Sequence, residues 1–174
     1  MELEVLISEE EIIKKLNELA DKINLDYKNS DKIVVIGVLK GSILVMSDIV
    51  KRLNLPIYMD FMVVSSYGNN TFSSGKINII KDIDENIKNV DVLIIEDIVD
   101  TGLTISKVVE HLMEYEPKSI KIMSLLNKKI DNKINMKIDY IGYDICDEFV
   151  VGYGLDYAGR YRNLPYIAIM KGEK

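Results

Sequence analysis

Three carboxylates near the middle of the chain follow a run of apolar residues. The stretch VLIIEDIVDTGLT (92–104) places Glu96, Asp97 and Asp100 at the end of that run, with Gly102 in the turn after it. Acids gathered at the end of a buried strand repel one another and lose hydration. A positively charged or hydroxyl-rich ligand would offset both costs. We therefore interpret this stretch as a binding site.

The turn after these acids is suited to a phosphate group. A helix is predicted from about Leu103 to Tyr115, and its first amide groups have no partner inside the helix. Those amides and the helix dipole favour an anion, and Gly102 lets a phosphate approach the backbone closely. The alternative is that Asp100 and Thr101 only cap the helix. A cap needs one such residue, whereas this turn also offers the hydroxyl of Thr104, so we favour a phosphate site beside the two preceding carboxylates.

The elements around this motif predict an α/β fold. KIVVIGVL (32–39), VLIIED (92–97) and SIKIMSLL (119–126) have the length of strands and are apolar in the manner of strands buried on both faces. Helical spacing occurs between them, as in ILVMSDIVKRL (43–53), and Ser8 begins a capping box before an N-terminal helix. Strands that alternate with helices predict a parallel sheet, whose ligands bind at the carboxyl ends of the strands.

Composition excludes several classes of function. The net charge of −6 and the absence of a basic block argue against a nucleic-acid partner. The single cysteine, Cys146, cannot form an internal disulfide, which suits a reducing compartment. MELEVLISEEE (1–11) has no signal-peptide pattern, and no apolar run reaches the roughly 20 residues of a membrane span. We expect a cytoplasmic protein without a membrane or nucleic-acid partner.

Two common phosphate-binding patterns are absent. A P-loop requires Gly-Lys followed by Ser or Thr, whereas here Lys40 precedes Gly41 and Ser42. The Rossmann pattern of three spaced glycines is also missing, because Gly152-Tyr153-Gly154 continues into other residues. The phosphate site must therefore be of another kind.

The motif resembles the phosphoribosyl diphosphate (PRPP) signature of type I phosphoribosyltransferases: an apolar run, Glu-Asp, two apolar residues, and Asp-Thr-Gly-x-Thr. LKGS (39–42) is similar to the pyrophosphate loop of that family, and SSYGNNTFSSGK (65–76) to its flexible catalytic loop. SLLNKK (124–129) and CDEFVVGYGLDYAGRYRNLPYI (146–167) resemble the purine-binding part of bacterial hypoxanthine(-guanine) phosphoribosyltransferases. The motifs occur in order and span nearly the whole chain.

This resemblance implies one type I phosphoribosyltransferase domain over residues 1–174, with a mostly parallel central sheet flanked by helices. A small purine-binding hood would form mainly from about 128–174 together with N-terminal residues. The implied reaction transfers the 5-phosphoribosyl group from PRPP to N9 of hypoxanthine, and of guanine, with Mg²⁺ as cofactor. The family also suggests a homodimer or homotetramer. The preference among hypoxanthine, guanine and xanthine stays open.

The resemblance also assigns roles to individual residues. The catalytic residues would be Ser66, Tyr67, Asp100 and Lys128. Ribose phosphate would be bound by Glu96, Asp97, Asp100, Thr101, Gly102, Leu103 and Thr104. Pyrophosphate would be bound by Leu39, Lys40, Gly41 and Arg162, with a cis peptide between the first two. The purine would contact Lys128, Phe149, Val150 and Asp156, and the metal would be near Glu96, Asp97 and Asp156.

Plainer interpretations of these residues remain open at this stage. Taken alone, Lys128 would be a solvated strand end, Phe149 a core residue, and Asp156 with Arg162 a surface ion pair. Polar loop 67–76 could be a linker instead of a lid. Two rival functions are a regulatory RNA-binding protein that reuses the fold, disfavoured by the acidic balance, and a phosphoacceptor signalling domain. The latter places acids after its first strand, whereas KIVVIGVLKGS has none.

Overall fold

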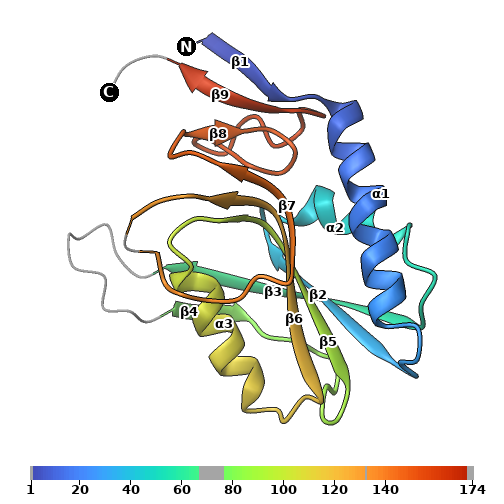
Figure 1. Ribbon diagram of the computed structural model, residues 1–174. Coiled ribbons are helices and arrows are strands. Elements are labelled where there is room, and N and C mark those ends of the chain that lie inside the picture. The colour runs from blue at the N-terminus through green and yellow to red at the C-terminus, as the bar shows by residue number, and fades with distance from the viewer. Residues whose placement is uncertain (1, 67–76, 132, 172–174) are drawn as a thin grey trace.

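The computed structural model describes residues 2–66, 77–131 and 133–171, and its strands form two sheets (Figure 1). The strands of the larger sheet are β2 (Ile33–Leu39), β3 (Ile57–Ser66), β4 (Ile77–Lys81), β5 (Asp91–Val99), β6 (Ser119–Lys128) and β7 (Tyr140–Ile145). The smaller sheet contains β1 (Glu2–Ile7), β8 (Val150–Val151) and β9 (Ile167–Lys171). The strand orders are β4-β3-β2-β5-β6-β7 and β1-β9-β8.

The larger sheet is mostly parallel, as the sequence predicts. β2 pairs in parallel with β3 and β5, β6 pairs in parallel with β5 and β7, and β4 is the antiparallel edge strand. β5 lies inside the sheet, and its residues from Asp91 to Glu96 are buried. Because parallel strands all end on the same side, the carboxyl ends of β2, β5 and β6 meet at one edge.

Helices cover both faces of the larger sheet (Figure 1). α1 (Glu9–Asp26) and α2 (Ile43–Val50) contribute to the apolar core on one face, and α3 (Leu103–Met113) contributes to the core on the other. α1 begins at the predicted capping box, in which Ser8 and Glu11 each satisfy a backbone amide of the other. The predicted type I phosphoribosyltransferase architecture of a mostly parallel sheet between helices is confirmed.

Two details differ from the sequence-based expectations. α2 and α3 end two or three residues earlier than predicted, because their last turns tighten to bonds such as Leu53 N to Val50 O and Tyr115 N to Leu112 O. The N-terminal strand β1 was not predicted. Its pattern is weak since most of its side chains are exposed, and it forms by antiparallel pairing with β9 at the far end of the chain.

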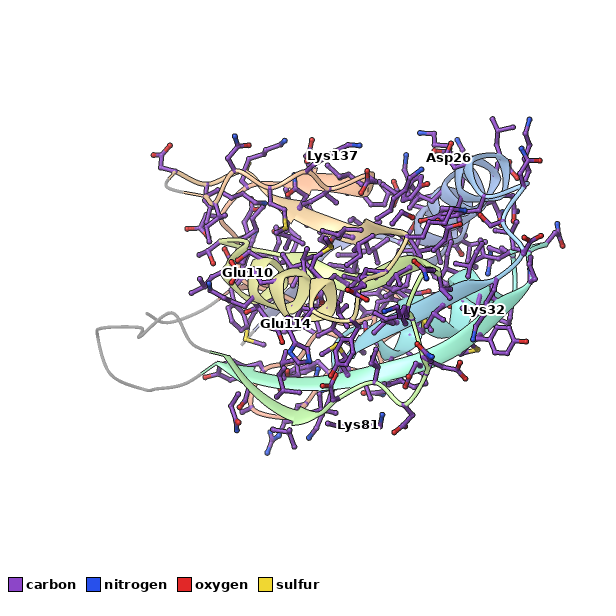
Figure 2. All side chains as sticks on the ribbon, turned by 90° about the horizontal axis from the view of Figure 1, so that it is seen from below. Asp26, Lys32, Lys81, Glu110, Glu114 and Lys137 are labelled. Atoms are coloured by element: carbon purple, nitrogen blue, oxygen red, sulfur yellow. The ribbon has the colours of Figure 1, made fainter. Side chains whose placement is uncertain are left out.

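The outside of the molecule carries charged side chains of both signs. Figure 2 labels six of them: Asp26, Lys32, Lys81, Glu110, Glu114 and Lys137. Several form ion pairs at the surface, such as Lys81 with Asp84 at 2.9 Å. Among the described helices, none is both long enough and apolar enough to span a membrane.

Candidate active site

A cavity of about 360 Å³ lies where the carboxyl ends of β5 and β6 meet the segments around the small sheet. Much of its lining consists of predicted site residues: Gly41, Asp97, Asp100, Lys128, Phe149, Val150, Asp156 and Arg162. These residues come from five separate parts of the chain and from both sheets. Figure 1 shows the small sheet beside this end of the larger one.

Of the two adjacent acids of β5, Glu96 is buried and Asp97 is half-buried, and the pKa of each lies above its ordinary value. Glu96 is 6% exposed, and burial, followed by the charge of Asp97, raises its pKa well above the ordinary value. Burial raises the pKa of Asp97 to about 6, although the amide of Ile98 donates to it at 2.9 Å and Arg162 lies near. Neighbouring residues on a strand point to opposite faces, so Asp97 lines the cavity described above and Glu96 lines the next one.

That second cavity, of about 90 Å³, is enclosed by the predicted phosphate loop, residues 100–104. Gly102 is the N-cap of α3 and has a left-handed conformation (φ 84°), with no side-chain capping bond. Thr101 Oγ1 accepts a bond of only 3.3 Å from the amide of Leu103. The carboxylate of Asp100 instead lies 3.4 Å from the ammonium of Lys128. Helix capping by Asp100 is therefore the wrong interpretation of this turn.

The loop after β2 packs closely between Asp97 of β5 and the backbone at Gly154, which follows β8. The peptide between Leu39 and Lys40 is cis, as the resemblance implies. A Cβ atom added to Gly41 would lie 1.7 Å from Asp97 Oδ2, and one added to Gly154 would lie 2.0 Å from the carbonyl oxygen of Gly41. Only glycine fits at both positions, and the close approach leaves the loop backbone at the cavity wall beside Asp97.

Lys128 is not a solvated strand end. Its side chain is 11% exposed, and its ammonium lies 3.0 Å from Asp147 and 3.4 Å from Asp100. Burial alone would lower the pKa of Lys128, but the two carboxylates outweigh burial and raise it. The side chain is therefore a fixed cation. Asp147 was not predicted, because nothing in its local pattern distinguishes it from other exposed acids.

The opposite wall of the cavity offers an open aromatic face. Phe149 is 53% exposed and contacts Tyr157 edge-on, with 5.8 Å between ring centroids. The alternative that Phe149 belongs to the core is wrong. Val150 is buried and pairs with Ile169 of β9, so the strand holds the neighbouring ring in place. Glu148, the residue before Phe149, also lines this cavity.

Asp156 and Arg162 form the ion pair that the plainer interpretation offered, at 2.6 Å, but both also line the cavity. Arg162 also donates to the carbonyl of Gly154 at 2.6 Å, and this bond fixes the guanidinium beside the backbone of Gly154. Over the described ranges, no group of three His, Cys, Asp or Glu side chains is arranged to hold a metal ion. A cation at this site would therefore need ligand oxygens in addition to protein carboxylates.

Of the predicted catalytic pair, the structure describes Ser66 but not Tyr67. Ser66 is the last residue of β3, whereas Tyr67 and the loop that continues to residue 76 lie outside the described residues. The prediction of a lid there stays a prediction. His111 of α3 bonds Asp82 at 2.7 Å and lines neither cavity.

The comparisons with known proteins agree with this geometry. The chain is 52% identical over 167 residues to the hypoxanthine-guanine phosphoribosyltransferase of Bacillus subtilis, covering 96% of this chain and 92% of that protein. A hypoxanthine phosphoribosyltransferase from Staphylococcus aureus superposes with a TM-score of 0.92 at 46% identity, covering 97% of this chain and 91% of that one. A hypoxanthine-guanine phosphoribosyltransferase from Bacillus anthracis gives a TM-score of 0.93 at 43% identity, covering 98% and 100%. Residues 5–158 match the phosphoribosyl transferase domain, and the chain belongs to that family.

Proposed function

We propose that the chain transfers the 5-phosphoribosyl group of PRPP to N9 of hypoxanthine and of guanine, which yields IMP or GMP and pyrophosphate. One observation carries this proposal: a fixed lysine cation with a carboxylate beside it and an exposed aromatic ring line the same cavity, and residues of the predicted phosphate loop line the next one. A planar base that accepts a hydrogen bond at one edge suits the first two features, and a sugar phosphate suits the third. The high identity to enzymes of this name supports the choice of base.

PRPP would extend from the phosphate loop to the loop after β2. The amides and hydroxyls of residues 100–104 would bind the 5′-phosphate at the start of α3. Glu96 and Asp97 would accept from the ribose 2′ and 3′ hydroxyls, and their negative charge would stabilise a sugar that becomes cationic as pyrophosphate leaves. Backbone groups of 39–41 and the guanidinium of Arg162 would bind the pyrophosphate, because Gly41 and Arg162 both line the cavity.

The unneutralised acids fit a hard cation such as Mg²⁺. Asp97 and Asp156 lie close enough for the charge of each to matter to the other, and burial already raises the pKa of Asp97. Asp97 and Asp156 line the same cavity and would supply oxygen ligands, with phosphate oxygens completing the coordination. Glu96, which the resemblance groups with them, lines the neighbouring cavity and would reach the ion only through bound substrate. Bound Mg²⁺ would offset the charge of the departing pyrophosphate. These acids would also orient the substrate in the site.

The purine would occupy the space between Lys128 and Phe149. Lys128 would donate to the 6-oxo group, Phe149 would stack on the ring, and the backbone of Val150 would contact the exocyclic edge together with Asp156. Asp100 lies 3.4 Å from the Lys128 ammonium, and N7 is adjacent to the 6-oxo group on the purine. Asp100 can therefore accept the proton that the base loses as N9 attacks C1′. Ser66 and Tyr67 would belong to a loop that closes over PRPP and excludes water.

Turnover of PRPP with a panel of bases tests the proposal. Hypoxanthine and guanine should be substrates, whereas adenine presents a donor where Lys128 also donates. Two opposed donors in a desolvated site cost about 1–3 kcal/mol each, so kcat/KM for adenine should be lower by roughly a hundredfold or more. Xanthine and orotate complete the panel, and turnover with each base ranks them as substrates. Equal use of adenine and hypoxanthine would refute the assignment of the base.

We also propose that the enzyme works in the cytoplasm as a homodimer or homotetramer, without a nucleic-acid or membrane partner. The acidic balance of the chain supports the absence of a nucleic-acid partner. Light scattering at several protein concentrations would measure the assembly, and a monomer at all of them would contradict it.

A further inference from the structure

The segment between β6 and β7, residues 129–139, passes next to the phosphate loop. In Figure 1 it is the orange stretch that crosses near the start of α3. Two of its residues bond to that loop: Lys133 Nζ donates to the carbonyl of Val99 at 3.1 Å, and the amide of Ile134 donates to the carbonyl of Thr101 at 2.9 Å. These two carbonyls stand immediately before and after Asp100.

Holding a carbonyl also sets the direction of the next amide. In a planar trans peptide, the carbonyl of one residue and the N–H of the following residue point in opposite directions. A Val99 carbonyl held toward Lys133 turns the amide of Asp100 the other way. A Thr101 carbonyl held toward Ile134 does the same for the amide of Gly102. Among the described residues, the 90 Å³ cavity is lined only by members of the stretch from Glu96 to Ile105 and by none from the 129–139 segment. An amide turned away from that segment is therefore turned toward the side on which this cavity lies.

The remaining contacts of Lys133 extend this support to the base-binding lysine. Its ammonium also donates to the carbonyl of Lys128 at 2.9 Å and to the side-chain oxygen of Asn127. Asn127 in turn donates to Asp144 of β7 at 2.6 Å. One ammonium therefore joins the ends of β5 and β6. All three of its acceptors are carbonyl or amide oxygens, which are oriented by these bonds and not merely neutralised.

We propose that Lys133 is a positioning residue for the 5′-phosphate: with the amide of Ile134, its ammonium holds the carbonyls around Asp100 away from the phosphate, so that the loop amides face it. This inference rests on the proposed function, because it deepens the role given to the 100–104 loop. It assigns no contact between Lys133 and substrate.

The alternative is that Lys133 only supports the fold. A cavity of about 550 Å³ lies beside the segment and is lined by Lys133, Ile134 and Met136 among others. Water in that cavity could hydrate the carbonyls if the ammonium were removed. The fold should then survive, while the direction of the loop peptides would no longer be fixed.

The test compares two ligands that differ only in the 5′-phosphate. Inhibition constants of IMP and inosine are measured for the wild type and for Lys133→Met, which keeps the aliphatic stem and removes the donor. The ratio of the inosine constant to the IMP constant reports what the phosphate contributes. Bonds to charged groups are strong, so we expect this ratio to fall at least about tenfold in Lys133→Met. Lys137→Met is the matched control, because Lys137 lies in the same segment, its side chain is 84% exposed and its ammonium pairs with Asp139; its ratio should equal that of the wild type.

Two further variants guard against misfolding. Lys133→Arg keeps a long donor and should retain the wild-type ratio within about threefold, whereas Lys133→Gln is too short and should lower it like Met. An unchanged ratio in folded Lys133→Met, or in Lys133→Gln if the Met variant does not fold, would overturn the inference. So would an equal weakening of IMP and inosine, which indicates general distortion. If the wild type neither bound IMP nor used PRPP with hypoxanthine, the proposed function itself would fail first.

Discussion

Each end of β5 carries a buried carboxylate, and the pKa is lowered at one end and raised at the other. At the amino end, Asp91 is 6% exposed and accepts bonds from Ser30 and Ser119 at 2.7 Å and from Lys118 at 3.0 Å. Burial alone would raise the pKa of Asp91, but these three donors outweigh it and lower the pKa. The charge at this end is fully matched by the protein.

At the carboxyl end, Glu96 is buried to the same 6%, yet among the described residues none donates a hydrogen bond to its carboxylate. Asp97 beside it also has a raised pKa. Asp91 and Glu96 are carboxylates on the same strand with the same exposed fraction, and what differs between them is the set of hydrogen-bond donors. A buried acid with its own donors stabilises the fold, whereas one without them is kept for a ligand that brings the missing charge or hydroxyl groups.

The sharpest way to separate the two ends is to remove divalent cations. If the acids at the carboxyl end depend on Mg²⁺, a chelator should abolish measurable turnover of PRPP, and added Mg²⁺ should restore it. The melting temperature of the ligand-free protein should stay unchanged, because Asp91 already has Lys118. Full activity in EDTA would contradict the metal role.

Asp100→Asn should produce the next largest effect. The amide keeps the shape of the side chain but cannot accept a proton, and loss of a general base lowers the rate by about 10²–10⁴-fold. Rapid-quench measurement of a single turnover should show this drop in the chemical step, with a modest change in the affinity for PRPP. A near-normal rate would leave Asp100 without a role in proton transfer.

Lys128→Ala tests whether the neighbouring strand end is also reserved for ligand. Removal of the ammonium should lower kcat/KM for hypoxanthine by roughly a hundredfold. It should also reduce the ratio of kcat/KM for hypoxanthine to kcat/KM for adenine. Steady-state assays with both bases measure the two ratios. The exposed residue Lys129, which pairs with Asp144 at the surface, supplies a matched control as Lys129→Ala. If the ratio of kcat/KM for hypoxanthine to that for adenine were unchanged in Lys128→Ala, the role of Lys128 in base selection would be refuted.

The same chemical change at the two ends of β5 should alter stability in opposite directions. At pH 8 and without ligand or metal, Asp91→Asn should lower the free energy of unfolding by about 1–3 kcal/mol, because it weakens the bonds that three donors make to a buried acceptor. Asp97→Asn should raise it by about 1–2 kcal/mol, because it removes an unneutralised charge. Urea denaturation measures both, with the exposed Asp21→Asn near zero as control. Destabilisation by Asp97→Asn would show that its charge is matched after all.

The pH dependence gives the smallest but most specific difference. The pKa of Asp91 is lowered on folding, so its stabilisation is present above the unfolded value of 3.8 and is lost as the pH falls through the lower folded pKa. The pKa of Asp97 is raised to about 6, so its favourable protonated state is lost as the pH rises from 3.8 through about 6. The stabilisation by Asp97→Asn should therefore shrink from pH 8 to pH 4.5. A constant difference across that range would rule out Asp97 as its source.

The sequence by itself determined the features that depend on neighbouring residues. The apolar runs of β2, β5 and β6, the capping box at Ser8 and the turn at Gly102 were all predicted, because period, length and turn chemistry are local properties. The motif order also predicted the mostly parallel sheet, through the resemblance to type I phosphoribosyltransferases.

Only the tertiary structure decided which charges are matched. Asp91 meets Ser30 across 61 positions of the chain, and Lys128 meets Asp147 across 19. The same holds for β1, which becomes a strand only by pairing with β9, and for Lys133, whose acceptors lie on two strands. A carboxylate or an ammonium looks the same in any sequence; its pKa and its use depend on burial and on partners that strand register and loop crossing bring together.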